Sequence, residues 1–151
     1  MITFLTSGGL IDALIAEKLA DCFEHYWSGR FDEASLLALP RIEAVTRTAA
    51  RTLGVRTYTE PGAPRTPVGK HAGLGELLSK MKGRLPEGQR RYLHRLLSDP
   101  LSLNTRNRLL HGLSIESNAQ EAALVLQAVC VLATWRRTAD GTDQASNGSD
   151  A

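Results

Sequence analysis

Residues 9–29, GLIDALIAEKLADCFEHYWSG, carry the pattern that decides the fold. Large apolar side chains recur there every three or four residues: Leu10, Ile11, Leu14, Ile15, Leu19, Cys22, Phe23, Tyr26 and Trp27. This spacing places them along one face of an amphipathic α-helix. We therefore predict a helix over about 9–28 that ends at Gly29, since glycine readily adopts the left-handed backbone that closes many helices.

The next segment, residues 31–54, repeats the helical spacing in FDEASLLALPRIEAVTRTAARTLG. Asp32 is the expected N-cap, because its carboxylate can accept the first free N–H groups, and Gly54 is the expected stop. Pro40 lacks the N–H that a helix interior requires, so we expect it to kink this segment or divide it into two helices. Similar spacing predicts further helices over 74–85, 86–99, 104–112 and 118–136.

Residues 118–136 are apolar on nearly every side. Such a helix must pack against other helices on more than one side, so it is either the central helix of the bundle or part of a dimer interface. Ser117 and Gln120 match the S-x-x-Q capping box, in which the two side chains satisfy free N–H groups at the start of a helix.

No strand alternation and no internal repeat stand out in the chain. We predict an all-α fold, an antiparallel helical bundle of about five to six helices. One domain is expected over 1–136. It is interrupted by a long mobile loop at about 55–72, where prolines and glycines gather, and followed by a disordered polar tail over 137–151.

The net charge of +2 is unevenly distributed. Residues 41–111 hold fourteen Lys and Arg against five Asp and Glu, a net charge of +9, whereas 1–40 and 112–151 are net acidic. A basic face of this kind could neutralise RNA phosphates. It could also be a solvated, arginine-rich surface, and composition alone slightly favours this second alternative.

Cysteine usage indicates a reducing compartment. Cys22 and Cys130 lie far apart without a CxxC motif, which argues against a disulfide framework or a zinc cluster. The N-terminus lacks the basic region of a signal peptide, and the longest apolar run is shorter than the ~20 residues that span a bilayer. We expect a cytoplasmic protein without a membrane partner, and we find no motif for a metal or another cofactor.

The stretch with the best candidates for catalytic residues is NTRNRLLHGL, residues 104–113. On a helix Asn107 and His111 share a face, Arg106 can curl toward them, and Leu109 and Leu110 are expected to face the core. Such a trio could act on a phosphodiester. The guanidinium would stabilise negative charge, the imidazole would move a proton, and the amide would orient the imidazole or hold a phosphate oxygen. Spacing alone does not distinguish this trio from a surface arginine and a helix-terminal histidine.

Further charged residues are candidates for structural or RNA-binding roles. Glu43 is a candidate acidic partner for a core arginine such as Arg47 or Arg51, a structural role. Six other cations of the basic region are candidates for guiding RNA through phosphate contacts: Arg108, Arg90, Arg91, Arg95, Lys80 and Lys82.

The segment RNRLLHG, with LN just upstream, resembles the R-N-x-x-x-H signature of HEPN domains. The blocks ALPRIEAVTRTAARTLGV, LGELL and YLHRLLSDP precede it in the order found in the C-terminal domain of uncharacterised bacterial HEPN-like proteins, and the similarity covers roughly residues 30–135. The resemblance implies a HEPN-like bundle that dimerises and places two copies of the motif in one cleft.

Many HEPN proteins are metal-independent endoribonucleases, often toxins or defence effectors, that cleave RNA by attack of a 2′-hydroxyl. By this resemblance Arg106, Asn107 and His111 would be catalytic, RNA the substrate, and an antitoxin or regulatory protein a further partner. Other members are non-catalytic modules for dimerisation or for binding RNA or protein, and that alternative remains open.

Overall fold

A computed structural model of the chain describes residues 1–58, 71–113 and 116–136. Over these residues the chain forms seven helices: α1 (Ile2–Thr6), α2 (Ala13–Trp27), α3 (Phe31–Thr52), α4 (Leu74–Lys80), α5 (Glu87–Leu97), α6 (Thr105–Leu110) and α7 (Ala119–Ala133). The only β-type pairing in the described ranges is one isolated bridge, between Tyr58 and His71. The all-α prediction is confirmed. Most of the expected loop and the whole expected tail lie outside the described residues.

The helix count exceeds the prediction because of α1. Its five residues are too few to show a helical period in the sequence. Gly8, just after α1, packs directly on the end of α7, where a Cβ at this position would lie 2.1 Å from the carbonyl oxygen of Trp135. The absence of a side chain at Gly8 therefore allows α1 to close one end of the bundle.

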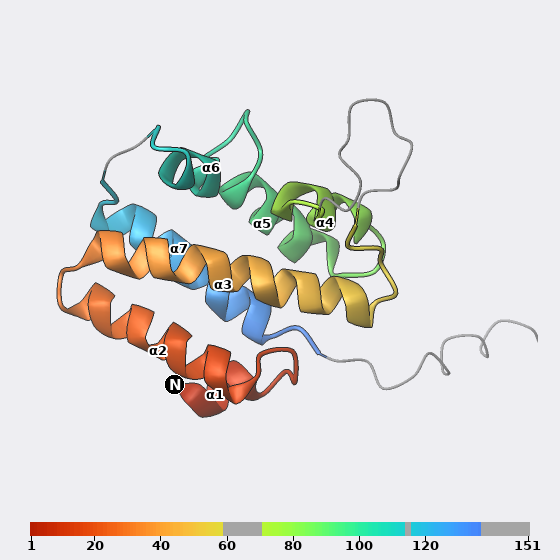
Figure 1. The fold of residues 1–151 in the computed structure, drawn as a ribbon, viewed down its shortest axis with the longest axis horizontal. Helices are drawn as coiled ribbons and strands as arrows, with labels where there is room; N and C mark the ends of the chain where they lie inside the picture. Colours follow the sequence, from red (N-terminus) through yellow and green to blue (C-terminus); the bar gives the residue numbers. More distant parts are fainter. Residues whose placement is uncertain (59–70, 114–115, 137–151) are drawn as a thin grey trace, which may run out of the picture.

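α3 crosses the middle of the molecule, with α2 along one side and α4, α5 and α6 along the other (Figure 1). α2 runs antiparallel to α3, as predicted. α7 instead begins at the same end as α3, and the expectation of a wholly antiparallel bundle is wrong for this pair. The reason is that α4–α6 carry the chain back along the bundle before α7 begins.

α7 is the central helix of the bundle. Its buried side chains pack against α1, α2, α3 and α5, and they are Ala122, Val125, Leu126, Ala128, Val129, Leu132 and Ala133. The chain itself therefore covers most of the apolar surface of residues 118–136, as the first of the two alternatives predicts. No described helix is both long enough and apolar enough to cross a membrane.

Two predicted caps are wrong, for one reason. The carboxylate of Asp32 accepts a hydrogen bond from the backbone N–H of Ser117 and does not cap α3, whose N-cap is Arg30. The Ser117 hydroxyl is buried against that of Ser35, 2.8 Å away, so Asn118 caps α7 by accepting the Glu121 N–H at 2.9 Å. Both side chains form hydrogen bonds between the starts of α3 and α7, and neither accepts from the free N–H groups of its own helix.

α3 continues through Pro40 as one helix, so the expected division of this segment is wrong. Pro40 and Leu36, whose carbonyl loses its helical partner at this point, both lie on the exposed side of α3. Water can satisfy that carbonyl, which explains why the proline is tolerated. The glycine stops are confirmed, since Gly29 and Gly54 adopt φ of +74° and +66° after α2 and α3.

Candidate functional site

The motif helix α6 is short and has two definite ends. It follows Asn104, a non-glycine residue at φ 48°, and stops before Gly112 at φ 68°, the cap positions expected from the sequence. Thr105 and Leu109, one turn apart, are its buried anchors. Leu110 is exposed, so its predicted core position is wrong. A helix of this length presents only one narrow stripe to the core.

Arg106 is held from two sides. Its Nη2 lies 2.8 Å from Oε2 of Glu43 on α3, and its Nη1 donates to the side-chain oxygen of Asn107 at 3.0 Å. The Asn107 amide in turn donates to the side-chain oxygen of Asn104 at 2.7 Å. These bonds fix the direction of the Arg106 guanidinium relative to α3.

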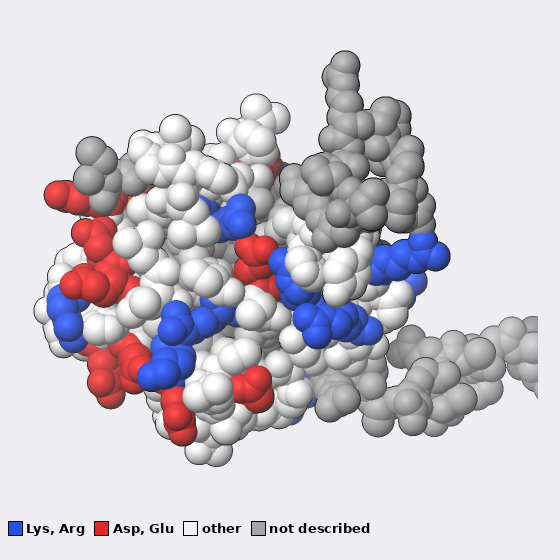
Figure 2. Space-filling model, in the orientation of Figure 1, with Lys and Arg blue, Asp and Glu red and all other residues white. Residues whose placement is uncertain are grey.

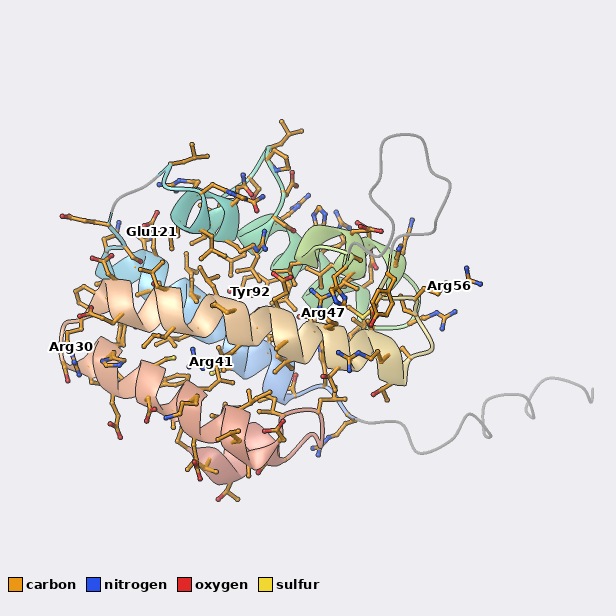
Figure 3. The ribbon with its side chains drawn as sticks, in the orientation of Figure 1. Arg30, Arg41, Arg47, Arg56, Tyr92 and Glu121 are labelled. Carbon is orange, nitrogen blue, oxygen red and sulfur yellow. The ribbon has the colours of Figure 1, made fainter. Side chains whose placement is uncertain are left out.

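Glu43 forms a second ion pair, with an arginine of its own helix. Its Oε1 lies 2.7 Å from Nη2 of Arg47, whose Nη1 donates to the Ala72 carbonyl at 3.1 Å, just before α4 (Figure 3). The predicted pairing of Glu43 with a core arginine is confirmed for Arg47, and Arg106 is an additional partner. No spacing in the sequence points to this second partner, because Arg106 follows Glu43 by 63 positions.

This cluster of Arg47, Glu43 and Arg106 is mostly withdrawn from water, with side-chain exposures of 16%, 20% and 22%. Two guanidinium groups share one carboxylate, so the cluster keeps a net positive charge. Charges in such a setting are screened less than surface charges. Nε of Arg106 is also buried and has no hydrogen-bond partner among the described residues. The cluster is therefore suited to attract an anion.

His111 lies at the C-cap of α6 and is exposed. Its backbone N–H donates to the Asn107 carbonyl at 3.1 Å, but its imidazole makes no hydrogen bond or ion pair with another described residue. Five helical positions separate it from Arg106, which corresponds to a rotation of about 140°. One chain thus joins Arg106 to Asn107 and leaves the imidazole of His111 free at the surface.

Three of the cations predicted to guide RNA are already paired. Arg108 lies 3.0 Å from Glu121 at the start of α7, and Lys80 lies 2.7 Å from Glu76 within α4. Arg90 is bound by Glu87 through two hydrogen bonds, of 2.7 and 2.8 Å, which raise the pKa of its guanidinium.

Four of the six cations share one surface hollow on α5, of about 320 Å³: Lys82, Arg90, Arg91 and Arg95. Arg91 and Arg95 also border a second hollow of about 380 Å³, which Tyr92 lines as well. The backbone N–H of Asn104 lies 3.5 Å from the Arg95 carbonyl, which ties this basic surface to the start of α6. Lys80 and Arg108 line neither hollow. His94 lines the first hollow, and neither His94 nor Tyr92 is among the residues predicted to bind RNA.

An apolar surface surrounds α6. Four exposed leucines lie just before, within or just after this helix: Leu101, Leu103, Leu110 and Leu113. Figure 2 shows few charged side chains over α6, whereas acidic and basic side chains alternate where α2 ends and α3 begins. An exposed apolar surface of this kind is typical of a site for protein association.

No described group of His, Cys, Asp and Glu side chains is arranged to hold a metal ion. No protein-family model matches the chain, and neither a curated protein nor a solved structure matches it.

Proposed function

We propose that the chain is a metal-independent endoribonuclease that acts as a homodimer and cleaves RNA by attack of a 2′-hydroxyl. One observation carries the proposal. Arg106 is fixed in a half-buried cluster that keeps net positive charge, on the same short helix as the exposed His111. This combination provides an oriented cation and a free imidazole at one surface.

The reaction needs charge stabilisation and proton transfer. When the 2′-oxygen attacks phosphorus, the bond to the 5′-oxygen breaks and a cyclic phosphate forms. The Arg106 guanidinium would stabilise the negative charge that grows on the non-bridging oxygens. The His111 imidazole would take the 2′-hydroxyl proton or give a proton to the leaving 5′-oxygen. Asn107 already binds Arg106, so its role is to position that guanidinium.

A dimer would complete the site. Within one chain Arg106 shares its charge with Glu43, and the His111 imidazole has no bond to it among the described residues. A second copy would bring a second Arg106 and a second His111 into the same cleft. The leucines around α6 provide apolar surface that such a dimer could bury.

The hollows on α5 would receive the RNA backbone. Lys82, Arg91 and Arg95 line them and have no carboxylate partner among the described residues. Each phosphate that they neutralise would release counterions and make binding weaker at higher salt. Tyr92, at the edge of the second hollow, offers a ring against which a base can stack.

The direct test is incubation of the purified protein with total RNA in the presence of EDTA. We expect cleavage products that end in a cyclic phosphate, identified by mass spectrometry. His111→Ala and Arg106→Ala should abolish cleavage. His71→Ala, which removes an exposed histidine outside α6, should leave it unchanged. If wild type and His111→Ala behave alike, the enzymatic proposal is wrong.

The second candidate function is a non-catalytic module for dimerisation or for binding RNA or protein. The pairing of Arg106 with Glu43 favours it, because an arginine that pairs with a carboxylate of its own fold is typical of a structural role. On this proposal Arg106→Ala changes the oligomeric state or partner binding, and wild type shows no nuclease activity. A role as toxin or defence effector, with an antitoxin or regulatory protein as partner, belongs to the first proposal.

A further inference from the structure

A separate pocket of about 320 Å³ lies where α3 and α7 end and α5 begins. Leu10, Leu53, Leu85 and Trp135 form its apolar walls, and Arg84 and Arg136 stand among its lining residues. Arg108 of α6 pairs with Glu121 in the first turn of α7, whereas this pocket adjoins the last turn of the same helix. Fifteen helical residues, about 22 Å, separate the two ends, so the pocket is distinct from the site on α6.

We propose that this pocket binds a small amphipathic carboxylate, such as a medium-chain fatty acid. The charges favour an anion, because none of the described residues that line the pocket is acidic. Arg84 donates to the Leu53 carbonyl, and Arg136 donates to the Ser7 carbonyl at 2.9 Å, both neutral acceptors. Neither guanidinium is paired with a carboxylate in the described part of the chain. Guanidinium groups bind carboxylates through paired hydrogen bonds.

The apolar walls favour an anion that also carries a hydrocarbon group. Trp135 is held in place because its Nε1 donates to the side-chain oxygen of Gln89 at 2.8 Å. The pocket is about twice as large as an apolar cavity of ~150 Å³, a size that takes up benzene. A carboxylate with a short alkyl chain fits this combination of volume, apolar wall and cationic residues.

The chain's own C-terminal segment does not match the walls. Residues 137–151 contain no Leu, Ile, Val, Met or aromatic residue, so they hold no side chain suited to an apolar pocket. The apolar walls of the pocket are therefore matched better by a ligand from outside the chain.

Tryptophan fluorescence provides a local readout. Trp135 lines the pocket and is 3% exposed, whereas Trp27, the other tryptophan of the chain, is 80% exposed on α2. In a Trp27→Phe background Trp135 is the sole reporter. Octanoate should change its emission saturably and raise the melting temperature. Octanamide should bind about tenfold more weakly, because it lacks the charge, and acetate should have no effect, because it lacks the apolar body.

Two variants test the two halves of the proposal in the same background. Arg84→Gln with Arg136→Gln should weaken octanoate binding to the level of octanamide, and Arg51→Gln, an exposed arginine of α3 that does not line the pocket, should not. Thr52→Phe should block both ligands. Thr52 lines the pocket, and its hydroxyl bonds only to the Thr48 carbonyl of its own helix.

Circular-dichroism melting of each variant without ligand checks that the fold is retained. The proposal is overturned if octanoate gives no saturable signal in the folded parent protein, or if octanamide binds as tightly as octanoate. An unchanged octanoate response in folded Thr52→Phe also overturns it, because the ligand would then bind elsewhere.

Discussion

The guanidinium of Arg106 lies 2.8 Å from the carboxylate of Glu43, which precedes it by 63 residues. This pair joins α6 to α3, the helix that crosses the middle of the molecule. The same carboxylate also holds Arg47 on α3. Glu43 is therefore the residue that sets both the position and the electrostatic environment of the motif arginine.

Glu43→Gln is expected to destabilise the fold by about 1–3 kcal/mol, because two half-buried guanidinium groups lose their shared counter-charge. Urea unfolding followed by circular dichroism measures the loss. The matched control is Glu76→Gln, which breaks the more exposed pair with Lys80 and should cost close to nothing. Equal losses in the two variants would show that the Glu43 pairs are ordinary surface contacts.

The sequence predicted the local features of this fold well. Gly29, Gly54 and Gly112 marked helix ends because a positive φ depends on a single residue. Helices over 74–85 and 86–99 followed from periodicity, and the structure has α4 and α5 within those ranges.

Features that depend on distant pairing were missed. The Asp32 carboxylate is used by Ser117, 85 positions away, and the Arg106 carboxylate partner lies on another helix. Pairs of residues so far apart in the chain produce no regular pattern that can be recognised in the sequence. The direction of α7 was not predicted for the same reason. It depends on α4, α5 and α6 returning the chain along the bundle, and no local sequence pattern predicts that path. In the candidate site, helical geometry predicted that Arg106 and Asn107 lie close together, but not that Glu43 and Asn104 hold them in place.

The hydroxyl groups of Ser35 and Ser117 form an isolated buried pair, which predicts strong coupling between them. Ser35→Ala should cost about 1–2 kcal/mol, because the Ser117 hydroxyl is left buried without its partner. The double variant Ser35→Ala with Ser117→Ala should cost less than the sum of the two single changes. A double-mutant cycle of urea unfolding measures the coupling, and strict additivity would mean that the pair contributes nothing.

Gly8→Ala tests the close approach of α1 to α7. The new Cβ would lie 2.1 Å and 2.8 Å from the carbonyl oxygens of Trp135 and Ala133, which are backbone atoms and cannot rotate away. We expect a loss of about 1–3 kcal/mol. Gly88→Ala is the control, since a Cβ there meets nothing within 4 Å in the first turn of α5, and alanine should stabilise that helix by up to about 1 kcal/mol. Thermal melting should therefore shift in opposite directions in the two variants.

Cys22 predicts a loss of stability at high pH. Burial raises the pKa of its thiol from 9.0 to about 11, although Arg41 acts in the opposite direction. In the unfolded chain the thiol ionises first, so its contribution to stability is complete below pH 9 and falls as the pH rises toward 11. Relative to Cys22→Ala, wild type should lose about 2 kcal/mol between pH 7.5 and 10.5. Urea midpoints at the two pH values test this, and a constant difference between the proteins would contradict it.

The leucines around α6 predict where a second copy binds. Leu113 is 75% exposed just beyond α6, and Leu110 is exposed at its last turn. If they form the centre of a homodimer interface, Leu110→Asp with Leu113→Asp should convert the dimer to a monomer, because burying carboxylates without partners is costly. Leu14→Asp, at a leucine of α2 that is 68% exposed, should leave the dimer intact. Sedimentation velocity at matched concentrations measures both, and a wild-type protein that is strictly monomeric would remove the composite cleft on which the nuclease proposal depends.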